Sequence, residues 1–414
     1  MELFRIVGGE RLSGAVSVAC AKNAILPILA AVILSEGIVS LKGCPRLHDV
    51  QNMLRILQTL GCAVEEKDDA IQIDPGNAAS WEMPEHLSKL LRSSIFMMGP
   101  ILGRFRKATV TYPGGCEIGL RPIDLHLKGL RALGVRIREA HGMLYCDGSE
   151  LQSGEVALDY PSVGATENVM MAAVLAPGTS VIHNAALEPE IVDLQNFINA
   201  MGGKISGAGS STIVIEGVKR LGGAMYRPIP DRIVAGTLLV AAAMTGGEIT
   251  LVDARADHMG VIIGKLRQAG CQILAEPDRI YLRAPERLRA IEVSTQPYPG
   301  FPTDMQAQIM ALTCIAEGTS MVVENVFESR FSHASQLRRL GADILTHDRT
   351  AVIRGGRLHG AQVHARDLRG GAALVLAGLA ADGVTEVTGL ESIDRGYASL
   401  ERTLSSLGAK IRRI

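Results

Sequence analysis

The chain has few aromatic residues and almost no net charge. Aromatic residues make up 4% of its 414 residues, and 42 Lys and Arg face 43 Asp and Glu, a balance of −1. Proteins that bind nucleic acid usually combine a basic surface with aromatic side chains that stack on bases. This composition therefore argues against nucleic acid as a partner.

Long apolar runs and signal-like segments are also missing. The run Ala24–Leu34 is shorter than the roughly 20 residues that a membrane-spanning helix needs. Residues 1–9 include Glu2 and Arg5, and the apolar core of a secretory signal does not follow them. We therefore expect a cytoplasmic protein with no membrane partner.

Cysteine is scarce and irregularly placed. The seven cysteines lie at positions 20, 44, 62, 116, 146, 271 and 314, and no pair has Cys-x-x-Cys spacing. An odd number of cysteines spread over a long chain fits neither a disulfide framework nor a zinc cage. Free thiols and no bound metal are expected.

Lysine is scarce relative to arginine, with 10 Lys and 32 Arg. The planar guanidinium presents paired N–H donors that match phosphate and carboxylate groups, so the excess fits an anionic ligand. A GC-rich coding sequence would produce the same excess, and the count alone does not separate the two explanations.

A six-fold repeat organises the chain. An apolar residue followed by Gly, between a predicted helix and a β-prone run, occurs six times. These joint glycines are Gly61, Gly134, Gly202, Gly270, Gly341 and Gly408. Their spacings of 73, 68, 68, 71 and 67 residues indicate six repeats of about 69 residues.

Each repeat contains an apolar helix, a short strand, an amphipathic helix and two further strands. The first helices are rich in small residues and apolar on nearly all sides, so they should be buried inside sheets. Their predicted ranges are Asn23–Leu34, Ser88–Leu102, Ala165–Ala176, Arg232–Met244, Asp304–Ala316 and Gly370–Ala380. The expected fold class is α/β, with helices inside and sheets outside.

The sixth repeat is truncated, because only one predicted strand follows Gly408. The segment Arg11–Ala15 resembles Arg220–Ala224 and Arg357–Ala361, at the spacing expected if the chain is read as a circle. We infer that the N-terminal residues complete the sixth repeat.

Two domains of three repeats follow from this closure. Prolines at positions 228 and 230 fit a linker between the third and fourth repeats. The predicted domains are residues 22–229, and residues 1–21 together with 230–414. A cleft between two domains is a usual place for a ligand, so we expect the active site there.

Three local patterns indicate chemistry. The loop Tyr112–Pro122, with three glycines and two prolines, presents Cys116 near Arg121, and a neighbouring cation favours the thiolate. Lys22 opens a helix, where free backbone N–H groups attract anions. Asp304 also lies at a helix start. Taken singly, each has a plain alternative: a buried cysteine in a turn, a solvated lysine and a helix cap.

Arginines recur at similar places in different repeats. Arg121 and Arg395 each lie 13 residues before their joint glycine, and Arg330 lies 11 residues before its own. Equivalent loops of a repeat should converge on one face. We therefore expect these guanidinium groups to surround one small anion.

Segments along the whole chain resemble the UDP-N-acetylglucosamine 1-carboxyvinyltransferases, a family of enolpyruvyl transferases related in fold to EPSP synthase. The matching segments are Ala21–Ala24, Leu91–Ser94, Pro113–Cys116, Arg121–His126, Pro161–Thr166, Glu188–Ile191, Phe301–Gln306, Val326–Phe331, Asp367–Arg369 and Ile393–Tyr397. The resemblance implies two inside-out α/β barrels of three repeats each. It also implies transfer of the enolpyruvyl group of phosphoenolpyruvate to the 3′-hydroxyl of UDP-N-acetylglucosamine, the step that opens peptidoglycan synthesis.

The resemblance also assigns residues to roles. It implies that Cys116 protonates the vinyl carbon and forms covalent adducts with phosphoenolpyruvate or fosfomycin, and that Asp304 accepts the sugar hydroxyl proton. Lys22 and Arg395 complete the implied catalytic set. The implied phosphoenolpyruvate contacts are Lys22, Asn23, Arg121, Arg330, Arg369 and Arg395. The implied nucleotide-sugar contacts are Asn23, Arg92, Arg121, Pro122, Ile123, Asp124, Leu125, Ser162, Val163, Asp304 and Val326. No metal or cofactor is implied.

Two positions depart from the family, and two alternatives stay open. Tyr160 stands where some members have a lysine expected to contact the diphosphate, and Phe96 stands where some have tryptophan. One alternative is the shikimate-pathway enolpyruvyl transferase, which lacks the Pro-Gly-Gly-Cys loop. The other is a catalytically silent paralogue that binds nucleotide sugars, which would be expected to lose residues such as Cys116.

Overall fold

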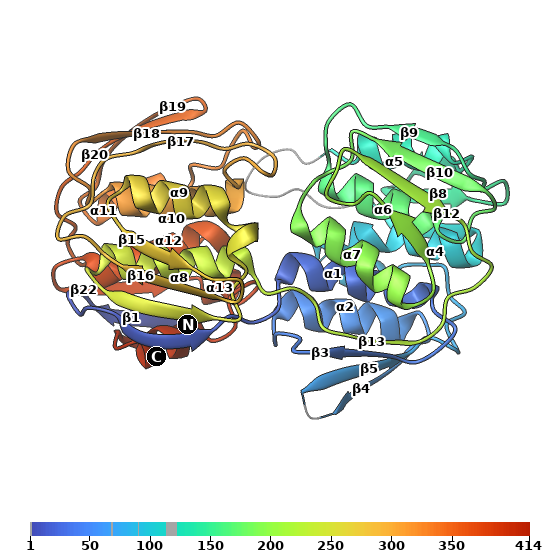
Figure 1. The fold of residues 1–414 in the computed structure, drawn as a ribbon, viewed down its shortest axis with the longest axis horizontal. Helices are drawn as coiled ribbons and strands as arrows, with labels where there is room; N and C mark the ends of the chain where they lie inside the picture. The colour runs from blue at the N-terminus through green and yellow to red at the C-terminus, as the bar shows by residue number, and fades with distance from the viewer. Residues whose placement is uncertain (1, 68, 90, 113–121) are drawn as a thin grey trace. The chain divides into compact units, whose positions relative to one another are not determined.

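The computed structural model describes residues 2–67, 69–89, 91–112 and 122–414, and its chain divides into two compact units. We call residues 2–19 with 230–414 the terminal unit, because it holds both chain ends. The described part of residues 20–229 is the inserted unit. In Figure 1 the inserted unit runs from blue to green, and the terminal unit combines dark blue with yellow to red.

The inserted unit contains seven described α-helices, two 3₁₀ helices and eleven strands. The helices are α1 (Lys22–Ala31), η1 (Val32–Leu34), α2 (His48–Thr59), α3 (Glu85–Ser88), η2 (Arg92–Met97), α4 (Met98–Phe105), α5 (Asp124–Ala132), α6 (Val163–Ala173) and α7 (Pro189–Ala200). The strands are β3 (Val39–Lys42), β4 (Ala63–Lys67), β5 (Ala70–Asp74), β6 (Lys107–Thr111), β7 (Arg136–Ala140), β8 (Met143–Asp147), β9 (Glu155–Ala157), β10 (Thr179–His183), β11 (Lys204–Ser206), β12 (Thr212–Glu216) and β13 (Ala224–Tyr226).

The terminal unit repeats this plan. Its helices are α8 (Arg232–Met244), η3 (Ala256–His258), α9 (Gly260–Gln268), η4 (Thr303–Met305), α10 (Gln306–Thr313), α11 (Ala334–Arg339), α12 (Leu368–Ala380), α13 (Leu390–Ile393) and α14 (Leu400–Ser406). Its strands are β1 (Leu3–Val7), β2 (Ser13–Ser17), β14 (Glu248–Val252), β15 (Gln272–Ala275), β16 (Arg279–Arg283), β17 (Glu292–Ser294), β18 (Thr319–Val323), β19 (Asp343–His347), β20 (Thr350–Arg354), β21 (Gln362–His364), β22 (Val384–Thr388) and β23 (Lys410–Arg413).

Each unit has three described sheets, and five of these six sheets share one pattern. A central antiparallel pair has a further antiparallel strand on one side and a parallel strand on the other. The sheet β6-β8-β7 has only antiparallel strands, with an isolated parallel bridge between Glu82 and Thr109. The inserted unit has the orders β13-β3-β5-β4, β11-β12-β10-β9 and β6-β8-β7, and the terminal unit has β15-β16-β14-β2, β17-β18-β20-β19 and β21-β22-β1-β23. Buried and exposed residues alternate along most strands, as expected for sheets with one face on the core and one on solvent.

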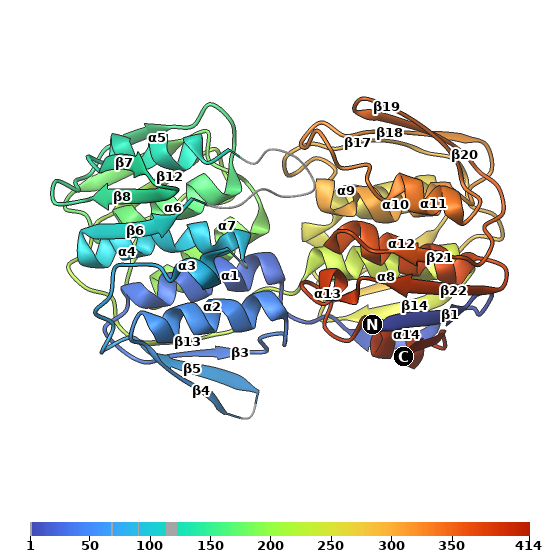
Figure 2. The ribbon, with the colours of Figure 1, turned by 180° about the vertical axis from the view of Figure 1, so that it is seen from behind.

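The N-terminal strand lies in the same sheet as the C-terminal strand. Strand β1 pairs antiparallel with both β22 and β23, so Phe4 lies opposite Val387 on one side and Arg413 on the other. Figure 2 shows this blue strand among the red elements of the chain's end. This pairing is the circular closure expected from the truncated sixth repeat.

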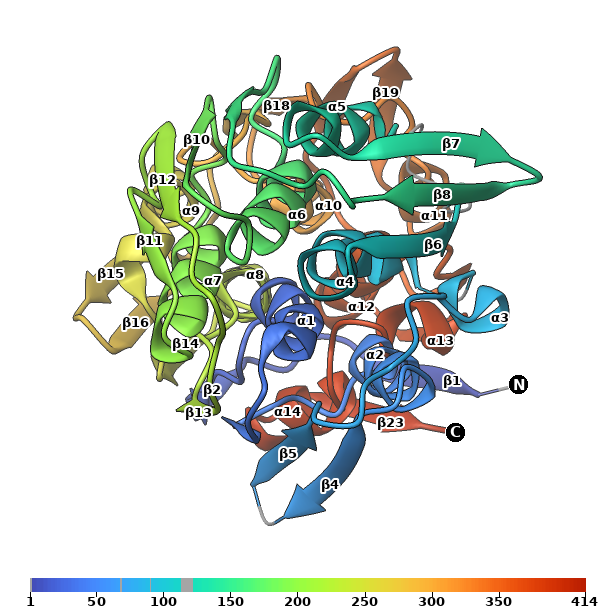
Figure 3. The same cartoon turned by 90° about the vertical axis from the view of Figure 1, so that its right-hand side faces the viewer.

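The cores consist of helices enclosed by the sheets. All eight residues of α10 are buried, and in α8 only Val234 is not. Figure 3 looks into the inserted unit, where α1, α4 and α6 lie inside the surrounding strands. The expected α/β architecture with helices inside is confirmed. Within the described residues, no helix has the length and apolarity needed to span a membrane.

One predicted helix is interrupted. The sequence predicts a single helix over Ser88–Leu102, but the structure has the end of α3, then 3₁₀ helix η2, and only then α4. The hydroxyl of Ser94 donates to the carbonyl of Ser88 at 3.1 Å. Serine side chains that bond nearby backbone in this way compete with continuous helix. The interruption places Arg92 at a helix start.

Helices α4 and α6 pack so closely that glycine is required between them. A Cβ atom on Gly99 would lie 2.3 Å from the backbone oxygen of Asn168. The backbone N–H of Gly99 donates to the Asn168 side-chain oxygen at 2.6 Å. The two helices are therefore held together by backbone proximity and by one buried amide.

Helix α6 also carries a buried acid, Glu167. Both carboxylate oxygens of Glu167 are buried, and neither has a hydrogen-bond partner among the described residues. Burial, reinforced by the nearby charges of Glu190 and Glu188, raises the pKa of Glu167 well above its ordinary value. At a pH between its unfolded and folded pKa values, Glu167 therefore stays protonated in the folded chain and is ionised in the unfolded chain.

We expect Gly99→Ala to destabilise the chain by about 1–3 kcal/mol, because the added methyl group overpacks the α4–α6 contact. Gly264→Ala in α9 is the matched control. Its Cβ meets nothing within 4 Å, so it should be neutral or stabilising by up to about 1 kcal/mol. Denaturant midpoints measure both variants. Equal midpoints would contradict the close packing.

Glu167→Gln should stabilise the chain increasingly as pH rises. A carboxyl group with a raised pKa in the folded state favours folding below its unfolded pKa, and this contribution is lost as pH rises toward the folded pKa. Within that window the slope is about 1.4 kcal/mol per pH unit, and glutamine removes it. Unfolding free energies measured from pH 4 upward test this expectation. A difference between variant and parent that does not change with pH would refute it.

Candidate functional site

In the inserted unit, the described residues that are predicted to bind either substrate lie at helix starts. Lys22 is the first residue of α1 and Arg92 the first of η2, while Ile123 and Ser162 directly precede α5 and α6. The adjoining positions are Asn23, Pro122, Asp124, Leu125 and Val163. Free backbone N–H groups at helix starts bind anions such as phosphate. Cys116 and Arg121 lie outside the described residues.

Lys22 is held by an acidic partner. Its Nζ lies 2.7 Å from Oδ2 of Asp49, the second residue of α2, and the two side chains are 10% and 2% exposed. Asp49 thus fixes the direction of the ammonium group and offsets part of the cost of burying it. The neighbouring Asn23 is exposed.

A buried amide joins the three helices η2, α5 and α6. The side-chain nitrogen of Asn168 lies 2.8 Å from Nδ1 of His126 in α5 and donates at 3.1 Å to the carbonyl of Ile95 in η2. Asn168 itself lies in α6. The starts of η2, α5 and α6 are therefore positioned relative to one another from inside the core.

In the terminal unit, Asp304 lies between two arginines. Arg330 Nη2 is 2.7 Å from Oδ1 of Asp304, and Arg369 Nη2 is 2.9 Å from Oδ2. The Asp304 side chain is 26% exposed, whereas those of Arg330 and Arg369 are 6% and 4% exposed. The carboxylate is therefore partly exposed, while the two guanidinium groups that hold it are almost inaccessible to solvent.

The pKa of Asp304 reflects these partners. Burial alone would raise it, but the charges of Arg369 and Arg330 and their hydrogen bonds outweigh burial and hold the pKa well below 3.8. In this arrangement Asp304 is ionised and only weakly basic. A proton-accepting role requires the two arginines to loosen their hold on it.

Arg369 is also fixed from its other side. Its Nη1 donates to the hydroxyl oxygen of Tyr397 at 3.2 Å, and that hydroxyl lies 2.9 Å from Thr237 Oγ1. Gln308 donates to Thr237 and to the backbone oxygen of Asp304, at 3.1 and 2.9 Å. These bonds link the buried helices α8, α10 and α12 to one guanidinium group.

Arg395 lies in the turn after α13, next to a separately anchored acid. Arg413 near the chain end donates to both oxygens of Asp394, at 2.9 and 2.5 Å. The neighbouring Arg395 is half-buried, and Tyr397 follows two residues later. The anchored Asp394 therefore fixes the turn that carries Arg395.

Val326 belongs to a loop held by a buried carboxylate. The backbone N–H groups of Val326 and Phe327 donate to Oε1 of Glu324 at 2.9 and 3.2 Å. Glu324 also accepts from the hydroxyl of Thr303, the residue before Asp304, at 2.9 Å. The terminal unit thus joins four predicted residues through contacts: Asp304, Arg330, Arg369 and Val326.

Sequence reasoning missed the residues that hold the predicted ones in place. Asp49, Asn168, Thr303, Glu324 and Tyr397 make the contacts described above. Two of them carried a local signal, since Thr303 directly precedes Asp304 and Tyr397 ends the Ile393–Tyr397 match. No local pattern indicates the other three: Asp49 and Asn168 bond residues far away in the sequence, and Glu324, although it lies close to Val326, also bonds the distant Thr303.

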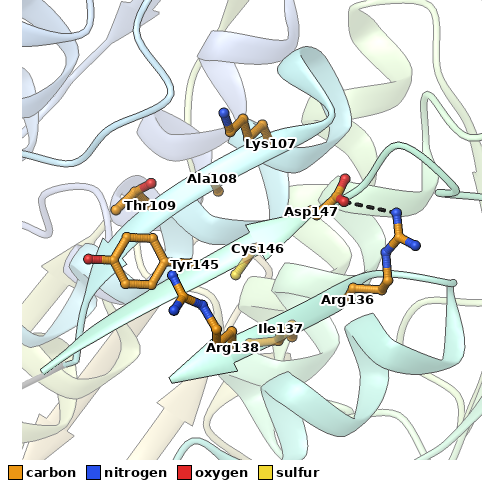
Figure 4. Close-up of a pocket in the computed structure, with 9 residues that line it drawn as sticks. All are labelled: Lys107, Ala108, Thr109, Arg136, Ile137, Arg138, Tyr145, Cys146 and Asp147. Atoms are coloured by element: carbon orange, nitrogen blue, oxygen red, sulfur yellow. Dashed lines mark hydrogen bonds and ion pairs between the residues drawn. The ribbon is translucent and has the colours of Figure 1, made fainter. Parts of the chain in front are cut away.

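A depression of about 290 Å³ on the sheet β6-β8-β7 is a different feature (Figure 4). Its cations are already engaged: Arg136 pairs with Asp147 at 2.9 Å, and Arg138 lies 4.9 Å from the ring centre of Tyr145. None of the predicted site residues lines it.

In the described part of the chain, no group of three or more His, Cys, Asp or Glu residues is arranged to hold a metal ion.

Comparison with known proteins matches residues 6–404 to the family EPSP synthase (3-phosphoshikimate 1-carboxyvinyltransferase). The chain is 54% identical over 416 residues to UDP-N-acetylglucosamine 1-carboxyvinyltransferase 2 of Caldanaerobacter subterraneus, with both chains fully covered. It is 46% identical to UDP-N-acetylglucosamine 1-carboxyvinyltransferase of Geobacter metallireducens, again with full coverage.

Solved structures agree on the fold. The enolpyruvyl transferase NikO from Streptomyces tendae superposes with a TM-score of 0.90 at 24% identity, covering 100% of this chain and 98% of that one. EPSP synthase from Acinetobacter baumannii gives 0.76 at 17% identity, with both chains fully covered. The two full-length relatives at 46% and 54% identity narrow the family assignment to one group of enolpyruvyl transferases. The chain therefore belongs to the EPSP synthase family and, within it, to the UDP-N-acetylglucosamine 1-carboxyvinyltransferases.

Proposed function

We propose that the protein transfers the enolpyruvyl group of phosphoenolpyruvate to the 3′-hydroxyl of UDP-N-acetylglucosamine and releases inorganic phosphate. The observation that carries this proposal is the position of the Asp304 carboxylate, whose oxygens lie 2.7 and 2.9 Å from guanidinium nitrogens of Arg330 and Arg369. The chain that holds this group is 54% identical to a UDP-N-acetylglucosamine 1-carboxyvinyltransferase. A carboxylate beside buried cations can accept a proton where a small polyanion binds. The product would enter peptidoglycan synthesis.

The reaction balances as an addition followed by an elimination. The sugar 3′-oxygen attacks C2 of phosphoenolpyruvate, its proton goes to Asp304, and C3 takes a proton from Cys116. C3 then returns a proton to the Cys116 thiolate, the C2–C3 double bond forms again, and the C2–O bond to phosphate breaks with its electron pair leaving on the phosphate oxygen. Charge develops on the phosphate and carboxylate, and preorganised cations stabilise it.

The low pKa of Asp304 gives the arginines a second role. While both guanidinium groups face Asp304, the carboxylate is a weak base. The carboxylate of phosphoenolpyruvate would compete for Arg330 and Arg369. Losing either partner raises the pKa of Asp304 toward its ordinary value and so makes it a better proton acceptor. Binding of one substrate would thereby activate the base for the other.

The remaining anionic groups have candidate partners. Lys22, Asn23, Arg121 and Arg395 would hold the phosphate of phosphoenolpyruvate. The helix starts at Arg92, Asp124 and Val163 supply N–H groups for the nucleotide sugar. Tyr160, which stands in place of a lysine, leaves the diphosphate to such backbone donors.

We place the reaction in the cytoplasm. Both substrates are multiply charged and do not cross a lipid bilayer unaided, because burying ionised groups in a medium of low polarity is very costly. The small molecules are the partners that this proposal requires, and it calls for no metal or cofactor.

Phosphate release tests the proposed function directly. Purified protein given phosphoenolpyruvate and UDP-N-acetylglucosamine should liberate inorganic phosphate, and Cys116→Ser should abolish or greatly reduce release while nucleotide-sugar binding stays near normal. Fosfomycin should add its mass to the Cys116 peptide.

Release of phosphate with shikimate 3-phosphate but not with the nucleotide sugar would replace this proposal with the shikimate-pathway reaction. Binding of the nucleotide sugar without turnover would favour the silent paralogue.

Asp304→Asn should lower kcat by about 10²–10⁴-fold, the usual range for loss of a general base. Asparagine is nearly isosteric, so the affinity for the nucleotide sugar, measured by calorimetry, should change little. Because the pKa of Asp304 lies well below 3.8 in the free protein, titration of Asp304 should not limit kcat/KM of the parent chain at mildly acid pH. A variant that retains full kcat would remove Asp304 from the mechanism.

A further inference from the structure

Glu324 is a fully buried acid that follows strand β18, outside the catalytic set considered so far. Its Oε1 accepts from the hydroxyl of Thr295 at 2.8 Å and from the backbone N–H groups of Val326 and Phe327. Its Oε2 accepts from the hydroxyl of Thr303 at 2.9 Å. One carboxylate thus receives four donors from three separate segments of the terminal unit.

The bond to Thr303 continues to the candidate base. Arg330 Nη1 donates to Thr303 Oγ1 at 3.0 Å, and Arg330 Nη2 is the atom that pairs with Asp304. An arginine only donates and an ionised carboxylate only accepts, so the Thr303 hydroxyl between them has a single orientation. The direction Arg330 to Thr303 to Glu324 is therefore set by the chemistry of the two ends.

A second connection reaches the same guanidinium. Glu324 holds the backbone of Phe327, and the carbon at the centre of the Arg330 guanidinium lies 5.2 Å from the centre of the Phe327 ring. A cation at this distance over an aromatic face is attracted to it. Glu324 therefore positions Arg330 through both a hydroxyl and a ring, and it also holds the backbone at Val326.

We infer that Glu324, acting through Thr303, is the positioning residue that aims Arg330 at Asp304 and shapes the nucleotide-sugar loop at Val326. This inference rests on the proposed function. Neither residue needs to touch substrate. Glu324 serves both substrates at once, because one of its oxygens is linked through Thr303 to Arg330, an expected phosphoenolpyruvate contact, and the other holds a loop expected to bind the sugar nucleotide.

Glu324 acts in two ways, through the Thr303 hydroxyl and through the backbone of the loop at Val326, and substitutions can separate the two. Thr303→Val removes only the hydroxyl link, whereas Thr303→Ser keeps it. Glu324→Gln disturbs both the hydroxyl link and the loop, because an amide places an N–H₂ donor where only donors now point. Thr385→Val is the matched control: its buried hydroxyl has no partner among the described residues, and it lies in β22 of the same unit.

Steady-state kinetics gives the main test. Thr303→Val should lower kcat by about 10–100-fold, because Arg330 is then no longer held where it must receive the carboxylate of phosphoenolpyruvate, while KM for UDP-N-acetylglucosamine should stay within about 3-fold of the parent. Thr303→Ser and Thr385→Val should keep kcat within about 3-fold. Glu324→Gln should lower kcat and also raise that KM. If Thr303→Val matches Thr303→Ser in kcat, or if Glu324→Gln leaves both kcat and KM unchanged, the inference is overturned.

The pH profile provides a readout that a purely structural role would not move. A less firmly held Arg330 raises the pKa of Asp304, so the acid limb of kcat/KM should shift to higher pH in Thr303→Val and not in Thr303→Ser. An acid limb at the same pH in both variants would count against the inference. Thermal midpoints of all four variants show whether any of them simply fails to fold.

Crystal structures separate this inference from the proposed function. Lack of phosphate release by the parent chain would defeat the proposed function, but the geometry would remain testable. The Arg330–Asp304 pair should separate beyond about 4 Å, the limit for an ion pair, in Thr303→Val and stay closed in Thr303→Ser. An intact pair in both structures would overturn the role of Glu324 whatever the activity.

Discussion

Two guanidinium groups buried behind a single carboxylate set the requirements for the rest of the terminal unit. Arg330 and Arg369 are almost inaccessible to solvent, and burying such charges is costly unless each has an acidic partner and further hydrogen bonds. Asp304 supplies the charge. Thr303 and Tyr397 each accept one further N–H group, from Arg330 and Arg369 respectively. The polar network is therefore continuous with the core, and the helices that enclose it cannot shift without disturbing the candidate base.

The repeat architecture determines where such groups can lie. The central helices are apolar on nearly all sides and enclosed by sheets, so only their ends and the following loops present polar groups to solvent. In the inserted unit the predicted contacts accordingly begin helices, as Lys22 and Arg92 do. In the terminal unit they begin α12 or follow a strand, as Arg369 and Val326 do. Buried side chains such as Asn168 and Glu324 then fix the helix ends and loops from inside.

The fold alone does not determine which substrate an enzyme of this family uses. The fold is shared with NikO and with an EPSP synthase at only 24% and 17% identity, so this packing of helices inside sheets does not by itself select a substrate. Specificity must come from the loops and helix ends. The low pKa of Asp304 illustrates the point, because it depends on two arginines that the repeat pattern does not require. A carboxylate placed between two arginines has a basicity that can respond to an incoming anion.

The amino-acid sequence by itself determined the six-fold repeat, the burial of the central helices and the pairing of the N-terminal strand with the chain's end. Each of these depends on local periodicity or on spacing, which a single sequence displays. Its motifs also marked Asp304, Arg330 and Arg369 separately. Only the tertiary structure brought those three together, broke the helix predicted over Ser88–Leu102, and connected Glu324 to Arg330 through Thr303. Such contacts join distant segments, and their geometry is decided by packing rather than by any local pattern.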